Sequence, residues 1–277
     1  MSNRALVLGG GGVTGIGWET GLIAGLAEQG IHLREAERIV GTSAGSSVAA
    51  AMVGKSSAEE NYAVQIAEGG KEISAAIGFT NIVRLLGPQL LPLGDESIAR
   101  MIGRSALNAS TVPESVRRAV IAERVGADNW PRPGLLFTAL DAATGERRVF
   151  DQESGVSMID AVAASCAVPT VWPPVTIGDR RYIDGGTLSG TNTDLAAGCD
   201  VVLVLAPTTL SLRKRWSVAA QLAALGPEVQ TLLLTPDAKA KQAMGKNALD
   251  PAFRAASAVA GRAQAREVGA AVGLLWH

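Results

Sequence analysis

Five residues between a short apolar stretch and a run of small residues constrain this chain more than any other feature. Residues 41–45 read Gly-Thr-Ser-Ala-Gly, a predicted strand ends just before them, and small side chains typical of a packed helix follow. The order strand, tight turn and helix is the context of a nucleophile elbow, in which a strained backbone exposes the serine hydroxyl at the helix N-terminus. Glycine suits Gly41 and Gly45 because a Cβ there would collide with the adjacent turn of chain. The pattern predicts that Ser43 is a nucleophile; the other interpretation is a glycine-rich helix N-cap.

A second glycine-rich segment follows the first predicted strand. Residues 5–8 are wholly apolar, residues 9–12 are all glycine, and helical character runs from residue 18 to residue 29. A glycine loop between a strand and a helix exposes backbone N–H groups at the positive end of the helix dipole. This segment therefore predicts a site that holds an anion or a developing oxyanion.

Two functions use such a loop. One is dinucleotide binding, because Gly10-x-Gly12-x-x-Gly15 matches that fingerprint and Glu35 and Glu37 follow at a distance suited to a ribose. The other is an oxyanion hole for acyl transfer. In a dinucleotide-binding unit nothing requires a serine elbow after the second strand. Parallel strands joined by a right-handed crossover end at the same edge of the sheet, so we expect the glycine loop and the elbow to face each other.

The middle of the chain has a different pattern. Residues 56–130 contain helical stretches and no convincing strand, which predicts a helical insertion that either caps the crevice or only shields the sheet. Strand character returns at residues 135–140 and 147–151. A hairpin around residues 178–179 then leads to Asp184, which two glycines follow. This pattern indicates either a carboxylate with close backbone access or an aspartate that caps a turn.

Later in the chain, residues 201–205 are the clearest buried parallel strand, and residues 236–277 form a helical tail expected to pack on the outer face of the sheet. Basic residues at 213–215 begin a predicted helix over residues 210–224, where they oppose the helix dipole. Two interpretations of this basic run stay open: a solvated face, or a transient contact with lipid headgroups at a membrane surface.

Composition excludes several classes of protein. The 277 residues are 47% hydrophobic and 18% charged, which suits a single globular domain with a large core. A net charge of −1, from 25 basic and 26 acidic residues, does not favour nucleic acid as a partner. Two cysteines fit a reducing compartment, and neither a signal peptide nor an apolar run of about 18 residues is apparent, so we expect a cytoplasmic protein, peripheral to the membrane if it contacts one.

Taken together, these segments resemble the patatin-like phospholipases. Residues 10–15 resemble the oxyanion loop of that family, residues 41–45 its nucleophile motif, residues 164–169 the segment before its base, and residues 184–186 its Asp-Gly-Gly. The resemblance implies a three-layer α/β/α sandwich with a mostly parallel central sheet and a helical cap insertion, spanning residues 1–277 as one domain. It also implies a Ser-Asp dyad that cleaves acyl esters, usually of lipids, without cofactor or metal; no oligomeric state is predicted.

The residues implied by the resemblance fall into three groups. The catalytic pair is Ser43 and Asp184, and the oxyanion donors are backbone groups of Gly11, Gly12 and Ala44. The glycines that shape the motifs are Gly10, Gly15, Gly41, Gly45, Gly185 and Gly186.

The chain departs from the family in two places. Thr14 stands where the family usually has Arg or Lys, which questions headgroup handling and the anchoring of the loop, and residues 192–194 read Asn-Thr-Asp instead of Asn-x-Pro.

The histidine count bears on the choice of base. His32 lies in a predicted loop and His277 is the last residue, where chain ends fray, so we expect Asp184 to act alone as the base. A Ser-acid-His triad would have to use His277. Three functions stay open at this point: an acyl-ester hydrolase, a non-catalytic lipid-binding module on the same fold, and a dinucleotide-binding protein.

Overall fold

A computed structural model describes residues 3–69, 73, 75 and 78–277. Within these residues the strands join in one sheet of eight, in the order β5-β6-β3-β2-β1-β7-β8, with β4 also paired to β3. Their bounds are β1 (Arg4–Leu8), β2 (Arg38–Thr42), β3 (Leu135–Asp141), β4 (Arg147–Phe150), β5 (Val175–Ile177), β6 (Arg180–Asp184), β7 (Val201–Leu205) and β8 (Gln230–Leu234).

The sheet is mostly parallel, as expected. Strands β1, β2, β3, β7 and β8 run in one direction, while β4, β5 and β6 pair antiparallel at one end. Leu8 at the end of β1 pairs with Gly41 on one side and Leu205 on the other. The carboxyl ends of these three strands therefore lie together at one edge of the sheet.

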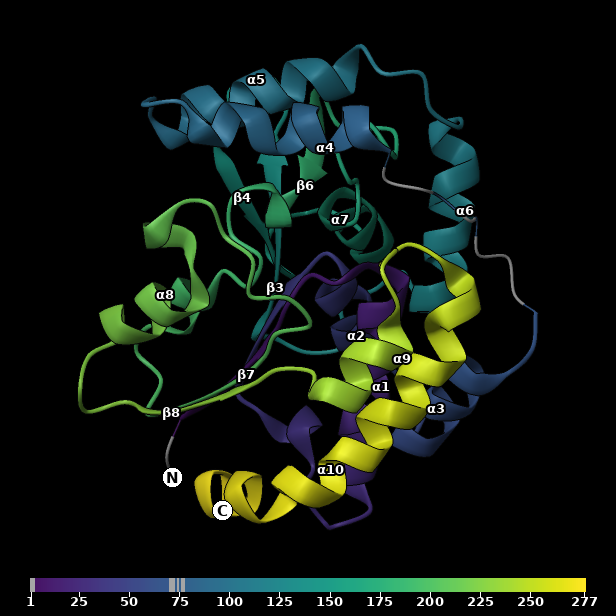
Figure 1. Cartoon of the computed structure of the whole chain (residues 1–277), viewed down its shortest axis with the longest axis vertical. Coiled ribbons are helices and arrows are strands. Elements are labelled where there is room, and N and C mark those ends of the chain that lie inside the picture. Colours follow the sequence, from purple (N-terminus) through teal and green to yellow (C-terminus); the bar gives the residue numbers. More distant parts are fainter. Residues whose placement is uncertain (1–2, 70–72, 74, 76–77) are drawn as a thin grey trace.

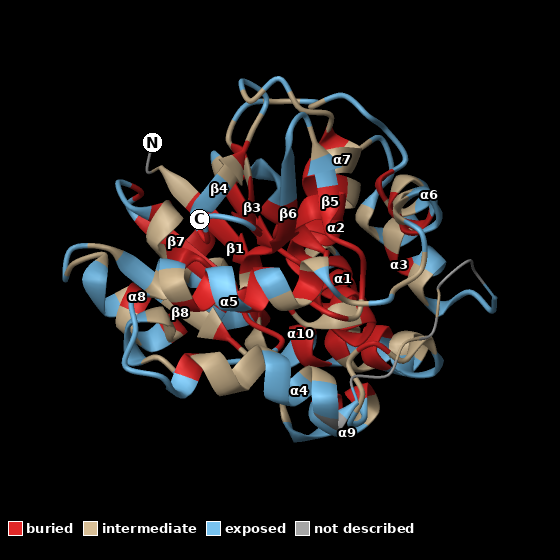
Figure 2. Cartoon of the chain, turned by 90° about the horizontal axis from the view of Figure 1, so that it is seen from above, coloured by how far each residue is buried: buried red, intermediate tan, exposed pale blue. Residues whose placement is uncertain are grey.

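Helices cover both faces of the sheet, which confirms the three-layer α/β/α sandwich (Figure 1). One face packs against α1, α2 and α7, and the other against α5 and α8. Figure 2 shows the buried strands in the middle of the molecule and exposed residues on the outer helices. The helix bounds are α1 (Gly12–Ala27), α2 (Ala44–Val53), α3 (Ala58–Ile66), α4 (Phe79–Leu86), α5 (Asp95–Leu107), α6 (Glu114–Val125), α7 (Met158–Ser165), α8 (Val218–Ala224), α9 (Ala238–Met244) and α10 (Arg254–Trp276), with 3-10 turns at η1 (Leu33–Glu35), η2 (Gly87–Leu90), η3 (Gly185–Thr187), η4 (Thr193–Ala196), η5 (Lys214–Trp216) and η6 (Pro251–Phe253).

Helix α1 begins earlier than the sequence predicts. It starts at Gly12 instead of residue 18, so only residues 9–11 remain as a loop after β1. Glycines repeat every fourth residue along α1, and side chains at Gly17, Gly21 or Gly25 would overlap α10. The close packing of α10 on these glycines compensates for their low helix propensity.

The C-terminal tail packs differently from the expectation. Helix α10 lies mainly against α1 and only touches β7 and β8, so it covers the helical layer and not the sheet itself. The prediction that the tail packs on the sheet is wrong for α10, because an alanine-rich sequence does not indicate which surface the helix packs against.

The helices of residues 56–130 contact several parts of the sandwich. Helix α3 packs on α1 and α10, α6 packs on α2 and α7, and α5 packs on β3, so these helices surround the sandwich. Residues 70–72, 74 and 76–77 of the expected cap lie outside the described residues. Whether this segment gates a substrate stays a prediction.

The basic run at residues 213–215 precedes a helix instead of starting one. Residues 214–216 form the 3-10 turn η5, and α8 begins at Val218, where Ser217 supplies the N-cap. Arg213 and Arg215 both form ion pairs with Asp95, so the conflict with a helix dipole is absent. In the described residues we find no helix long and apolar enough to span a bilayer.

Candidate active site

Ser43 occupies the turn between β2 and α2 in a strained conformation. Its φ of 52° and ψ of −118° lie in a region that residues with a side chain rarely adopt. A Cβ at Gly41 would overlap the backbone of Ser46, and one at Gly45 would overlap the carbonyl of Leu8. Gly41 thus leaves room for the adjacent turn, as expected from the sequence, whereas Gly45 leaves room for β1, a contact between distant segments.

Asp184 lies at the end of β6, where the register of β3 and β6 places it opposite Ala139. Its carboxylate accepts a hydrogen bond from the Gly186 amide at 2.7 Å, and the Ser43 side chain lies close enough to act on its pKa. Ser43 is 8% exposed and Asp184 is 4% exposed, so the pair is almost closed to water. Burial raises the pKa of Asp184 to about 7, although the Ser43 side chain and the Gly186 amide both act to lower it.

The glycine loop lies directly against the elbow. A Cβ at Gly10 would touch the Cβ of Ser43, and the Gly45 amide donates to the Gly9 carbonyl at 3.1 Å. The Gly9 and Gly10 amides donate to the carbonyls of Leu205 and Gly190, so neither is free to bind a substrate oxygen. These three backbone hydrogen bonds hold the loop between β7, the elbow and the segment after Asp184.

The amides of Gly11, Gly12 and Ala44 also lie near the elbow, where α1 and α2 begin. Among the described residues, none accepts a hydrogen bond from the amides of Gly11, Gly12 or Ala44. Gly12 and Ala44 are the first residues of α1 and α2, so their N–H groups also lie at the positive ends of two helix dipoles. This arrangement suits stabilisation of a negatively charged oxygen.

Thr14 does not anchor the loop through its side chain. The residue is fully buried, and its hydroxyl has no hydrogen-bond partner among the described residues, whereas its amide donates to the Ala248 carbonyl at 3.1 Å. The loop is therefore held by backbone contacts where the family usually has a basic side chain.

Two residues behind the elbow hold its backbone. The Ser165 hydroxyl accepts from the Ser43 amide at 2.9 Å, and the Cys166 thiol donates to the Ser43 carbonyl at 3.1 Å. Both residues are buried at the end of α7. Sequence reasoning gave neither residue a role; their place within residues 164–169, which resemble the segment before the base of the family, was the available signal.

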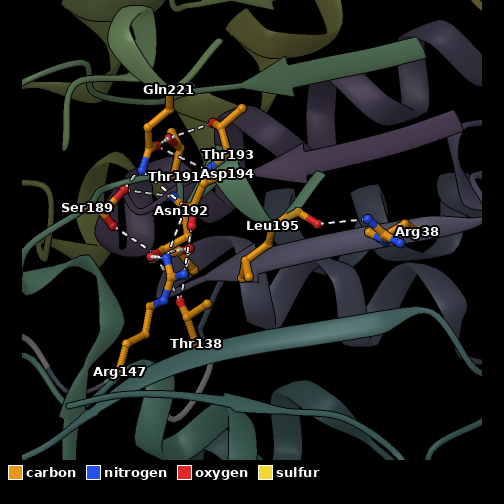
Figure 3. Close-up of polar contacts among 11 residues, drawn as sticks. Arg38, Thr138, Arg147, Ser189, Thr191, Asn192, Thr193, Asp194, Leu195 and Gln221 are labelled. Carbon is orange, nitrogen blue, oxygen red and sulfur yellow. Dashed lines mark hydrogen bonds and ion pairs between the residues drawn. The ribbon is translucent and has the colours of Figure 1, made fainter. Parts of the chain in front are cut away.

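Asn192 connects β2, which leads into Ser43, with β3, which pairs with the strand that carries Asp184 (Figure 3). Its side-chain amide donates to the Thr42 and Thr138 hydroxyls at 3.0 and 3.1 Å, and its oxygen accepts from Arg147 at 3.1 Å. Thr42 immediately precedes Ser43, and Thr138 precedes the residue that pairs with Asp184. Asn192 has a φ of 49°, so it joins Ser43 and Thr170 as the non-glycine residues with positive φ among those described.

The residues around Asn192 explain the departure from Asn-x-Pro. Asp194, at the usual proline position, forms a two-point ion pair with Arg147 at 2.7 and 2.9 Å. Gln221 of α8 accepts from the Thr193 amide and donates to Asp194 (Figure 3). Side-chain contacts therefore hold this segment where a proline would restrict the backbone.

We expect Asn192→Ala to lower kcat about tenfold to a hundredfold while changing KM little. The variant leaves Thr42 and Thr138 without their shared donor, and small displacements of catalytic groups have effects of this size. Steady-state kinetics on a soluble ester measure the split between kcat and KM. Thr208→Ala, at an exposed loop position, is the control, and an equal effect in both variants would contradict a positioning role.

The two histidines lie at the opposite edge of the sheet. His32 comes before the start of β2, and His277 follows Trp276, whose carbonyl accepts from Arg4 at the start of β1. Ser43 follows the carboxyl end of β2, so neither imidazole lies near it. Glu37 contacts the Arg4 amide at this same far edge, which excludes the dinucleotide site because its ribose-binding acid would belong beside the glycine loop.

Glu19 is a buried acid that sequence reasoning missed. Its side chain is fully buried on α1, close to the backbone of Gly9, and burial raises its pKa well above the ordinary value for a glutamate. The raised pKa favours the neutral form of Glu19 beside the glycine loop. An acidic residue within an otherwise apolar and glycine-rich helix was the available signal.

Comparison with known families identifies the chain. The model of the patatin-like phospholipase family matches residues 6–197, which is more than half of the sequence. The chain belongs to the patatin-like phospholipase family. Membership supports a hydrolase that acts on lipids. A search among curated proteins finds no match.

Two solved structures are similar to this chain. VipD from Legionella pneumophila is 12% identical with a TM-score of 0.50, and the alignment covers 98% of this chain and 67% of VipD. The type III effector protein ExoU is 16% identical with a TM-score of 0.40, over 97% of this chain and 53% of ExoU. The chain thus spans about two thirds of VipD and about half of ExoU; at this identity the VipD likeness shows the fold.

Proposed function

We propose that this patatin-like phospholipase is a serine acyl-ester hydrolase that cleaves lipid acyl esters with Ser43 and Asp184. The observation that carries the proposal is a strained elbow that holds Ser43 beside the glycine loop, with the buried Asp184 carboxylate close enough to its side chain for the two to interact. Membership of the family supports a lipid substrate, and the carboxylic ester is the bond we propose to be cleaved.

The first half of the reaction forms an acyl-enzyme. Ser43 Oγ attacks the ester carbonyl carbon while Asp184 accepts its proton, and the carbonyl oxygen becomes an oxyanion. The amides of Gly11, Gly12 and Ala44 donate to this oxygen, which explains why they have no acceptor among the described residues. Asp184 then protonates the leaving alcohol as the tetrahedral intermediate collapses.

The second half releases the acid. Asp184 accepts a proton from water, which attacks the acyl-enzyme carbonyl, and then returns a proton to Ser43 Oγ. A pKa of about 7 makes Asp184 a stronger base than an exposed aspartate, and the same value lets it act as an acid in the alternate steps.

Hydrolysis of p-nitrophenyl esters of increasing chain length tests this function. We expect measurable turnover of at least one ester in the series, and labelling of Ser43 by a fluorophosphonate probe. Mass spectrometry of the labelled peptide identifies the modified serine. Labelling of another serine with Ser43 unmodified would assign the activity elsewhere in the chain.

A non-catalytic lipid-binding module is the remaining alternative. It would be favoured if Ser43 and Asp184 lay apart, whereas the Ser43 side chain lies close enough to Asp184 to act on its pKa. The ester series separates the two functions, because a binding module would release no p-nitrophenol.

A further inference from the structure

Exposed apolar side chains gather on two segments that are distant in sequence. Of the large hydrophobic residues exposed on the described chain, half lie on residues 79–94 or 207–217. Leu90 is 73% exposed and Leu210 is 69% exposed. The other exposed members are Ile82, Val83, Leu91, Leu93 and Leu212. Isolated exposed leucines are ordinary on a protein surface, but a cluster of this kind marks a contact surface.

Arg213 joins the two segments into one surface. Its guanidinium donates to the carbonyls of Gln89, Leu91 and Leu93, at 3.4, 3.3 and 2.8 Å, and also pairs with Asp95. These hydrogen bonds therefore hold in place the backbone that carries the leucines. We call residues 79–94 together with 207–217 the leucine surface.

The leucine surface borders the candidate active site on two sides. Pro207, at one end of it, lies so close to Gly11 that a Cβ on that glycine would overlap the proline ring. On the other side, Gln89 donates to the Thr187 carbonyl at 3.2 Å, and the Thr187 hydroxyl donates to the Asp184 carbonyl at 2.6 Å. A partner on this surface would thus lie beside both the glycine loop and the base.

The charge of the leucine surface indicates which kind of partner it would bind. Its two segments contain Arg84, Arg213, Lys214 and Arg215 and no acidic residue, in a chain whose net charge is −1. Exposed residues lie along α4, within this surface, and along the neighbouring α5 (Figure 2). Exposed leucines beside basic side chains match the acyl and headgroup layers of an anionic bilayer.

We propose that the leucine surface docks the protein on an anionic phospholipid bilayer, with the active site facing the lipid. Leu90 and Leu210 enter the boundary between headgroups and acyl chains, and Lys214 and Arg84 contact the headgroups. The proposal rests on the proposed function only for its consequence, which is that a lipid ester reaches Ser43 from the bilayer. Docking itself needs no catalysis.

Vesicle flotation with the Ser43→Ala protein tests docking while the lipids stay intact. We expect binding to vesicles of equimolar phosphatidylglycerol and phosphatidylcholine. Adding Leu90→Ser with Leu210→Ser should weaken this binding at least about tenfold, because the two leucines that enter the bilayer on docking are lost. Adding Lys214→Glu should weaken it at least about fivefold on the anionic vesicles and leave any binding to pure phosphatidylcholine unchanged.

The matched control replaces Val259 and Leu274 with serine. Both are exposed on α10, which lies apart from α4 and α5 in Figure 1. This control should bind vesicles like the parent. In the background with Ser43 intact, the leucine double variant should hydrolyse a soluble short-chain ester within about twofold of the parent, as expected of surface substitutions. Loss of ester turnover in the parent itself would refute the hydrolase and not the docking.

Two results would overturn the docking proposal. One is equal vesicle binding by the leucine double variant and the α10 control. The other is a parent protein that is dimeric in solution, together with a leucine double variant that is monomeric and binds vesicles as well as the parent. A second copy of the chain would then be the partner of the leucine surface.

Discussion

Replacing Ser43 with alanine should lower kcat for ester hydrolysis by about 10⁴-fold or more. The alcohol that forms the acyl-enzyme is lost, and no other serine in the described chain has the positive φ of a strained elbow. Initial rates on p-nitrophenyl esters measure the loss, and circular dichroism establishes that the fold is intact. Ser56→Ala, an exposed serine just beyond α2, is the control and should keep the parent rate.

Labelling gives a second readout of the same prediction. A fluorophosphonate probe should modify the parent and Ser56→Ala proteins and leave Ser43→Ala unlabelled. Undiminished turnover or labelling in Ser43→Ala would place the nucleophile elsewhere.

Asp184→Asn should inactivate the enzyme almost as completely, because an amide cannot accept the proton of Ser43. Loss of a general base usually costs about 10²–10⁴ in rate, and a buried pair that acts as a unit lies at the upper end. The Ser43→Ala/Asp184→Asn double variant should be little slower than either single variant. Multiplication of the two losses would argue that the residues act independently.

The pH dependence of the parent should report the same carboxyl group. As a base Asp184 must be ionised, so kcat/KM should fall as pH drops below an apparent pKa of about 7. A histidine could produce a similar limb, which is why the variant with both His32→Ala and His277→Ala is the control. It should keep the same profile and a kcat within about threefold of the parent, small beside the loss of a base.

Stability should change with pH in the opposite sense to activity. The folded pKa of about 7 exceeds the unfolded value of 3.8, so the stabilisation from protonated Asp184 is full below about pH 4 and is lost as pH rises through 7. Asp184→Asn removes this titration. Relative to the parent, the variant should gain up to about 4 kcal/mol in free energy of unfolding between pH 4 and pH 8, since one pKa unit corresponds to about 1.4 kcal/mol. Urea denaturation at both pH values measures the gain, and an unchanged difference would mean that Asp184 does not titrate in this range.

Much of the fold could be predicted from local patterns. The strands at residues 5–8, 135–140 and 201–205 are short apolar runs, and the Gly178-Asp179 turn joins β5 to β6 as expected. Such elements are decided by hydrophobic periodicity and turn chemistry within a few residues. The elbow at Ser43 belongs in part to the same class, because Gly41 is required by the adjacent turn of the elbow, whereas Gly45 is required by Leu8 on β1.

The start of α1 and the position of α10 could not be predicted from local sequence patterns. Glycines disfavour a helix locally, and only the close approach of α10 to Gly17, Gly21 and Gly25 explains why the helix begins at Gly12. The basic run near Arg213 was likewise ambiguous, because its partner Asp95 is more than a hundred residues away.

The sequence by itself determined which residues are candidates for the site, because the elbow, the glycine run and the Asp-Gly-Gly are contiguous motifs. The tertiary structure alone decided how they act together. Ser43 and Asp184 meet because β2 and β6 both flank β3, and the pKa of Asp184 depends on burial by residues from several elements. Ser165, Asn192 and the leucine surface act through contacts between distant segments, and such contacts depend on packing that no local pattern encodes.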